Sequence, residues 1–270
     1  MPTLKLTLAY EGSAYVGWQR QPNGPSIQGC LESALGEIEK CAVPVVGAGR
    51  TDAGVHALAQ VAGVRLVQDI GPTALVRAVN ARLPADIRVI SADVVADTFH
   101  AQREATAKTY RYRILHGVLS SPFRRRYGWQ MAEPLDHGLM AQAACGLVGE
   151  HDFAAFQATG GSVKTTVRRL WTVTVGGPAA DPGPVDDGFG GDVTTVEVRG
   201  NGFLRHMVRI IVGTLVEVGR GHRGKEDVDR ALKTGERSDA GQTAPPQGLF
   251  LVRVDYASVP PVTTGWTPEG

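Results

Sequence analysis

Hydrophobic and polar positions alternate near the start of the chain and predict a strand over 4–10. The pattern then changes to helical spacing over 27–39, with Ser26 as the expected N-cap. Strands follow over 43–46, 58–67 and 87–96, and a helix over 72–83. This first half mixes strands and helices without the regular alternation of a parallel α/β sheet.

The second half of the chain repeats this style. Its patterns predict strands over 108–116, 167–175, 193–199 and 249–256, and helices over 138–148, 203–218 and 225–233. A stretch rich in Gly, Pro and Asp, 176–192, predicts an exposed loop. We therefore expect an α+β protein with an N-terminal half over 1–102, a C-terminal half over 103–256 and a tail over 257–270.

Composition supports a folded, reduced protein. The 270 residues are 43% hydrophobic and 20% charged, which excludes a disordered chain. Cys30, Cys41 and Cys145 form no C-x-x-C pair, so a disulfide scaffold or a cysteine zinc site is not expected. No signal peptide is visible, and Arg209 and Glu217 interrupt the longest apolar run, so we expect a cytoplasmic protein without a membrane span.

The net charge of +1 conceals an uneven distribution. Residues 103–126 hold seven Lys or Arg against one acidic residue, with aromatic residues between them. Cations interleaved with rings are typical of an RNA-contacting surface, although a solvated charged face has the same composition. The excess of Arg over Lys fits either phosphate contact or codon bias.

The Gly-rich loop over 47–56 contains the most informative candidate chemistry. It lacks the Lys and Ser/Thr of a phosphate-binding Walker loop and the third glycine of a dinucleotide fingerprint. Asp52 is the only acidic residue between Lys40 and Gln68, so the loop alone supplies neither a carboxylate pair nor a metal site. Asp52 could cap a turn, or it could act as a lone nucleophile beside Arg50. His56 is interpreted as a loop or core residue.

The run Gly49–His56, GRTDAGVH, resembles the signature of the tRNA pseudouridine synthase A family. Further family-like blocks are YVGWQRQ over 15–21, SIQ over 26–28, FHA over 99–101, ATAKTYRY over 105–112, GEHDF over 149–153, NGFLRHMVR over 201–209 and GLFLV over 248–252. An eight-residue match with ordered flanking blocks along nearly the whole chain is a specific signal.

The resemblance implies a fold and an activity. The fold would be two RRM-like (ferredoxin-like) α/β halves related by pseudo-two-fold symmetry, with a mixed, mostly antiparallel sheet and a central cleft. The activity would be isomerisation of uridines at positions 38, 39 and 40 in the tRNA anticodon stem-loop. The family resemblance also implies a homodimer, and a reaction that needs no cofactor or metal.

By the same resemblance, Asp52 is the catalytic aspartate, Tyr110 contacts the target base and Arg209 pairs with the aspartate. Arg50 resembles a residue that holds the flipped-out nucleotide, and Leu249 an apolar wall of the pocket. From the residues alone, Tyr110 could equally be core, because period two places it on one face of its strand with Lys108.

Helix 203–218 would place Arg205 and Arg209 four apart near its positive end, which suggests a waiting anion, either Asp52 or phosphate. We assign Arg209 to the aspartate and leave Arg205 to RNA or to no role. Two other functions remain: a noncatalytic RRM-like tRNA-binding module, and a hydrolase that releases the base. Analysis of the product separates the three.

Overall fold

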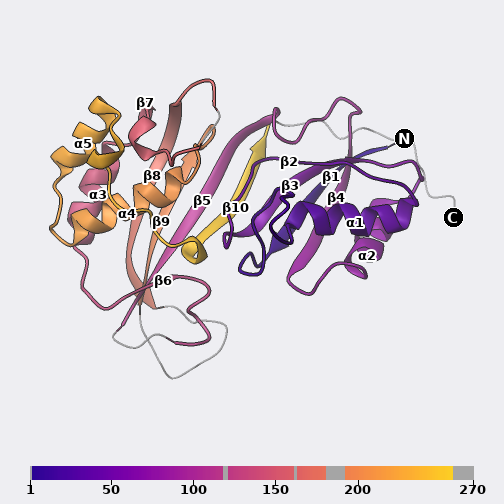
Figure 1. Ribbon diagram of the computed structural model, residues 1–270, viewed down its shortest axis with the longest axis horizontal. Helices are drawn as coiled ribbons and strands as arrows, with labels where there is room; N and C mark the ends of the chain where they lie inside the picture. The colour runs from indigo at the N-terminus through magenta and orange to yellow at the C-terminus, as the bar shows by residue number, and fades with distance from the viewer. Residues whose placement is uncertain (1, 118–120, 161–162, 181–191, 258–270) are drawn as a thin grey trace, which may run out of the picture.

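The computed structural model describes residues 2–117, 121–160, 163–180 and 192–257. Its described strands form one mixed, mostly antiparallel ten-stranded sheet with helices at both ends (Figure 1). The strands are β1 (Thr3–Tyr10), β2 (Val45–Gly47), β3 (His56–Arg65), β4 (Ile87–Val95), β5 (Ala105–His116), β6 (Trp129–Met131), β7 (Gly149–Asp152), β8 (Val167–Ala180), β9 (Asp192–Gly200) and β10 (Leu249–Tyr256). The helices are α1 (Ile27–Glu39), α2 (Pro72–Asn80), α3 (His137–Cys145), α4 (Met207–Gly219) and α5 (Lys225–Thr234).

The main path of the sheet runs β4-β1-β3-β10-β5-β9-β8-β7, with β2 paired to β3 and β6 paired to β5. In the N-terminal half the strand order is therefore β4-β1-β3-β2, with α1 and α2 connecting the strands. In the C-terminal half the order β10-β5-β9-β8 follows the same sequence of strands and crossovers, with α3 and α4 as its helices.

The two halves join where β10 runs parallel to β3. Phe250 pairs with His56 and Leu251 with Ala57, while β10 pairs antiparallel with β5 on its other side. The last strand of the chain thus lies at the centre of the sheet, beside the strand that follows the Asp52 loop (Figure 1).

Local sequence signals explain where several elements begin and end. Ser26 caps α1, since its hydroxyl accepts a hydrogen bond from the Gly29 N–H at 3.1 Å, and Lys40 ends the helix in the left-handed conformation. The alternation in β1 is confirmed, because Leu4, Leu6 and Leu8 are all fully buried. Among the described residues, no helix has both the length and the apolar character needed to cross a bilayer.

Several predicted boundaries are wrong. Helix α4 begins at Met207 rather than 203. Helix α3 ends at Cys145 with Gly146 as its C-cap, and Gly149, which was expected to close the helix, begins β7 with φ of 119°. Strand β8 continues to Ala180, into the predicted loop, and residues 181–191 lie outside the described part, as does the tail from 258. The short strands β6 and β7 have too few residues to show a period and were not predicted.

Candidate active site

Asp52 lies in the connection between β2 and β3, and an earlier segment of the chain holds this loop in place. Gly17 and Asp52 form an isolated antiparallel bridge, and the Trp18 N–H donates to the Thr51 carbonyl at 3.0 Å. Gly17 has φ of +111°, and a Cβ there would lie 2.5 Å from the Thr51 oxygen. Only glycine permits this approach of the two backbones.

Side chains from β1 and β3 form hydrogen bonds with the loop that contains Asp52. The Tyr10 hydroxyl and Thr51 Oγ1 are hydrogen bonded at 2.8 Å, and the Gln60 amide donates to the Gly49 carbonyl at 2.9 Å. Burial raises the pKa of Tyr10 to about 12, so this phenol stays protonated at neutral pH. The segment directly before Asp52 is therefore held by buried polar side chains that are hydrogen bonded.

The Asp52 carboxylate faces two side chains from the start of α4. Arg209 Nη1 lies 3.5 Å from Oδ2, and His206 Nε2 lies 3.6 Å from Oδ1. Asp52 keeps 29% of its side chain exposed and Arg209 only 12%, so the pair lies at the edge of the interior. Among the described residues the carboxylate accepts no backbone hydrogen bond, which leaves the turn-capping interpretation without support.

Arg209 is itself held by the segment that precedes β10. Its Nε donates to the Ala244 carbonyl at 2.7 Å, and the Ala244 N–H donates to the Arg209 carbonyl at 3.0 Å. The next residue, Pro245, accepts a 2.8 Å hydrogen bond from the Tyr112 hydroxyl of β5. These contacts fix the guanidinium so that its remaining N–H groups point at Asp52.

Tyr110 is buried on β5, and its ring meets the edge of Phe203 at a centroid distance of 5.1 Å. Burial raises its pKa well above the ordinary tyrosine value, and the charges of Tyr10 and Asp52 add to the shift. The Asp52 carboxylate is therefore close enough to the Tyr110 phenol to act on it electrostatically. The phenol is a neutral aromatic surface next to Asp52 at physiological pH.

The other expected site residues differ in their surroundings. Arg50 is exposed and makes no hydrogen bond or ion pair within the described part of the chain. Leu249 is buried and pairs with Tyr112 in the β10–β5 register. Lys108 is half-buried against Gly49, and burial lowers its pKa.

His56 and Arg205 are held by contacts away from the carboxylate. His56 is buried, its Nδ1 accepts from the Gly12 N–H at 3.0 Å, and its Nε2 lies 2.9 Å from the Arg126 carbonyl. This places it in the core, as expected. Arg205 precedes α4 and donates to the Thr159 carbonyl at 2.9 Å, so the predicted stacking of Arg205 and Arg209 on one helix is wrong.

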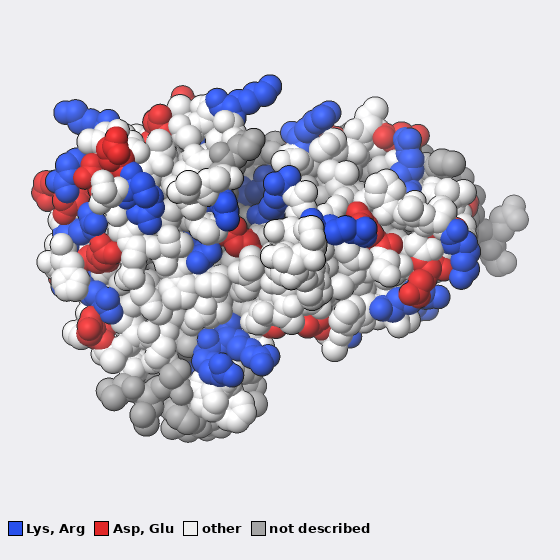
Figure 2. Space-filling model, viewed as in Figure 1, with Lys and Arg blue, Asp and Glu red and all other residues white. Residues whose placement is uncertain are grey.

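The basic run 103–126 does not form one continuous face. Arg111 is paired with Glu197 through two hydrogen bonds of 3.1 and 2.9 Å, and Arg124 is buried. Lys108 lies beside the Asp52 loop, whereas Arg125 and Arg126 are exposed in a separate segment after 121. Figure 2 shows Lys and Arg side chains around the hollowed centre of the visible face and a second group below it.

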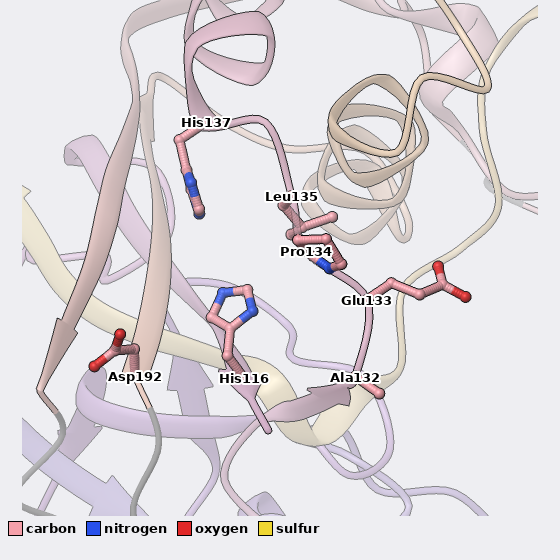
Figure 3. A pocket seen from close by; sticks show the side chains of 7 residues that line it. All are labelled: His116, Ala132, Glu133, Pro134, Leu135, His137 and Asp192. Carbon is pink, nitrogen blue, oxygen red and sulfur yellow. The ribbon is translucent and has the colours of Figure 1, made fainter. Parts of the chain in front are cut away.

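A cavity of about 310 Å³ lies elsewhere, at the far end of β5 (Figure 3). Its lining is His116, Ala132, Glu133, Pro134, Leu135, His137 and Asp192. Nε2 of His116 and Nε2 of His137 each lie 2.7 Å from Thr194 Oγ1, so each imidazole has this hydroxyl as a hydrogen-bond partner. Within the described residues, no group of three or more His, Cys, Asp or Glu is arranged to hold a metal ion.

Comparison with known proteins shows the family to which the chain belongs. The family model described as tRNA pseudouridine synthase matches residues 7–102 and 143–257, which include Asp52, His206 and Arg209. The chain belongs to the tRNA pseudouridine synthase family. It is therefore an isomerase that converts uridine in tRNA to pseudouridine.

Curated relatives named tRNA pseudouridine synthase A match over nearly their full length. The protein of Myxococcus xanthus is 46% identical over 98% of this chain and 96% of its own. That of Syntrophotalea carbinolica is 46% identical over 95% and 97%, and that of Limosilactobacillus fermentum 44% over 96% and 97%. A chain in a solved structure of a Cbf5-Nop10-Gar1 complex matches 92% of this chain and 48% of its own length, at 13% identity and a TM-score of 0.33.

For a synthase of this family, the structure brings Asp52, Tyr110 and Arg209 together and leaves Arg50 exposed at the edge of the same loop. Sequence reasoning missed His206, Phe203 and the support given by Tyr10 and Gln60. His206 lies within the NGFLRHMVR block, but only its backbone conformation, which no local pattern predicts, directs it at Asp52.

Proposed function

We propose that this enzyme isomerises uridines at positions 38, 39 and 40 of the tRNA anticodon stem-loop, with Asp52 as the nucleophile. The observation that carries the proposal is the arrangement of one carboxylate, partly exposed, against Arg209 and beside the buried Tyr110 ring. A single carboxylate held by a cation suits covalent catalysis, because an ionised carboxylate can itself be the nucleophile.

The reaction conserves every atom of the nucleotide. The bond between N1 of the base and C1′ of the ribose breaks, the base turns, and C5 bonds to C1′. The C5 proton is lost and N1 gains one, so no oxidant or reductant is consumed. An Asp52 carboxylate oxygen would bond to C1′ as the N1–C1′ bond breaks, and C5 would displace it from C1′ after the base has turned, which returns the free carboxylate. Arg209 would fix the orientation of the carboxylate.

The residues around Asp52 fit an unstacked nucleotide. The target base would contact the Tyr110 ring, with Leu249 as an apolar wall and Arg50 holding the flipped-out nucleotide. Lys108, half-buried beside Gly49, would add positive charge where the phosphate backbone enters. Sites near a loop favour this geometry, since a base close to unpaired nucleotides costs less to extrude.

At the level of the molecule, we infer two RRM-like halves, 1–102 and 103–256, related by a pseudo-two-fold axis. The shared strand order of the halves supports this inference, with β10 closing the second half beside β3. We also infer a cytoplasmic homodimer that binds one tRNA across both subunits. Light scattering that gives a monomer at working concentration would contradict the dimer.

The decisive experiment incubates unmodified tRNA with the wild type and with Asp52→Asn, followed by mapping of pseudouridine. Asparagine keeps the size of the side chain but removes the nucleophilic charge, so the variant should fold and bind tRNA yet form no pseudouridine. Normal activity of Asp52→Asn would disprove the nucleophile. Released uracil in place of pseudouridine would identify a hydrolase, and modification outside 38–40 would disprove the assigned positions.

A further inference from the structure

The residue before α4 adopts an unusual backbone conformation. His206 has φ of 59° and ψ of 6°, and with Lys40 it is one of two non-glycine residues with positive φ in the described part of the chain. This left-handed conformation is unfavourable for a residue with a Cβ, so the surrounding contacts must hold it. Hydrogen bonds from Ile210 N–H to the His206 carbonyl at 2.9 Å and from Met207 N–H to Leu204 at 3.1 Å hold the turn.

The consequence of this turn is the direction of the imidazole. Positions 206 and 209 are one helical turn apart, and their side chains end at different oxygens of the same carboxylate. Arg209 lies at Oδ2 and His206 at Oδ1, so the two contacts together determine the rotation of the carboxylate about its Cβ–Cγ bond. Either contact alone would leave that rotation free.

His206 has the charge state expected of a neutral hydrogen-bond donor. Burial lowers its pKa below the ordinary histidine value, Arg209 and Arg205 lower it further, and only Asp52 raises it. The imidazole is therefore neutral at physiological pH. A neutral donor orients the carboxylate without adding a second positive charge, which would hold the nucleophile back from the substrate.

We propose that His206 is a positioning residue whose Nε2–H donates to Oδ1 of Asp52 and sets the angle of the nucleophile. The inference rests on the proposed role of Asp52. The present separation of 3.6 Å is longer than a hydrogen bond, and contacts of this kind shorten when substrate fills the site.

Two substitutions of His206 separate the donor from the fold. Gln places its amide N–H near the position of Nε2. Asn is one methylene shorter and is, among residues with a Cβ, one of those that best tolerate the left-handed turn. His206→Asn should lower the single-turnover rate roughly tenfold or more, the range found for residues that orient a reacting group, with tRNA affinity unchanged. His206→Gln should restore the rate to within about threefold of the wild type.

The pH profile gives a second readout. Protonated His206 would attract the Asp52 carboxylate more strongly. The wild-type rate should therefore fall at acidic pH, and the rate of His206→Gln should not show this decrease. The charged groups facing the imidazole are Asp52 from the β2–β3 loop, Arg205 from the preceding turn and Arg209 from α4. They are the same in both proteins, so the difference between the two profiles reports His206.

The outcomes can be distinguished from failure of the proposed function when Asp52→Asn is measured in parallel. If Asp52→Asn were active, Asp52 would not be the nucleophile and the proposed function itself would fail. An inactive Asp52→Asn together with a wild-type rate for His206→Asn would overturn only the positioning role. A folded His206→Gln as slow as His206→Asn would also overturn it, and thermal unfolding of each variant supplies the check on folding.

Discussion

Tyr110 shows how burial determines what a single side chain can do. Its phenol is protonated far beyond neutral pH because burial raises the pKa, and its hydroxyl makes no hydrogen bond among the described residues. The ring, held against Phe203, is thus the part of Tyr110 that is available to a substrate. The proposed contact with the base is therefore aromatic rather than acid–base.

This leads to a prediction for two variants of Tyr110. Tyr110→Phe keeps the ring and should leave the alkaline side of the pH–rate profile unchanged, because the phenol does not titrate there. Tyr110→Leu removes the ring and should weaken the productive complex by about 1–3 kcal/mol, the usual contribution of a stacked base. Single-turnover rates from pH 6 to 9 test both, and an alkaline limb that disappears in Tyr110→Phe would contradict the aromatic role.

The contact between Asp52 and Arg209 that the family resemblance implied is present in the structure. Asp52 and Arg50 share one short motif, so their proximity is local, whereas the contact of Asp52 with Arg209 joins residues far apart in the chain. The family-like block around 201–209 allowed the pairing to be predicted. His206 could not be assigned in this way, because its direction depends on a backbone angle set by the turn before α4.

At the scale of elements, the start of α4 shows why periodicity overestimates a helix. Leu204 continues the apolar spacing of Val208 and Ile211 and is buried with them, so the pattern extends the helix back to 203. The chain instead turns at His206, and Leu204 reaches the same core from outside the helix. Apolar spacing reports burial, and here burial continues past the helix end.

The close approach of the segment around Gly17 to the Asp52 loop gives a second prediction. Gly17→Ala should lower the free energy of unfolding by about 2 kcal/mol or more, because the methyl group meets a backbone oxygen and φ is positive. It should also reduce pseudouridine formation, since the displaced loop carries the nucleophile. Urea unfolding and the tRNA assay measure the two effects.

The matched control for this prediction is Gly71→Ala. Gly71 precedes α2, has φ of −62° and has no atom within 4 Å of an added Cβ. Its loss of stability should stay below about 1 kcal/mol, because Ala is a poorer N-cap than Gly but meets no atom here, and activity should be unchanged. If Gly17→Ala behaved like Gly71→Ala, the close packing of the two segments would not matter for the site.

At the scale of the whole molecule, the site exists because β10 joins the two halves. Asp52 belongs to the first half, and Tyr110, His206 and Arg209 belong to the second. The strand pattern of 249–256 predicted β10 itself but could not predict that it pairs parallel with β3 and antiparallel with β5. Such pairing depends on contacts between distant parts of the chain, which no window of sequence contains.

His56 lies where β10 joins the two halves, and its protonation should make the stability of the protein depend on pH. Its imidazole stacks on Phe250 of β10 at 4.7 Å, accepts a hydrogen bond from Gly12 and contacts the Arg126 carbonyl. Burial lowers the pKa of His56, although Glu11, 3.4 Å from Nδ1, opposes the shift. The folded protein therefore favours the neutral imidazole, whose Nδ1 can accept the Gly12 N–H.

The sign of the effect on stability follows from linkage. Below the ordinary histidine pKa the unfolded chain binds a proton that folded His56 resists, so stability is full above about pH 6.5 and falls as the pH decreases. His56→Gln should reduce the difference in unfolding free energy between pH 7.5 and 5.5, measured with urea. His116 and His206, whose pKa values are also lowered, leave a remaining difference of the same sign. A pH difference in His56→Gln equal to that of the wild type would show that protonation of His56 does not affect the stability of the junction.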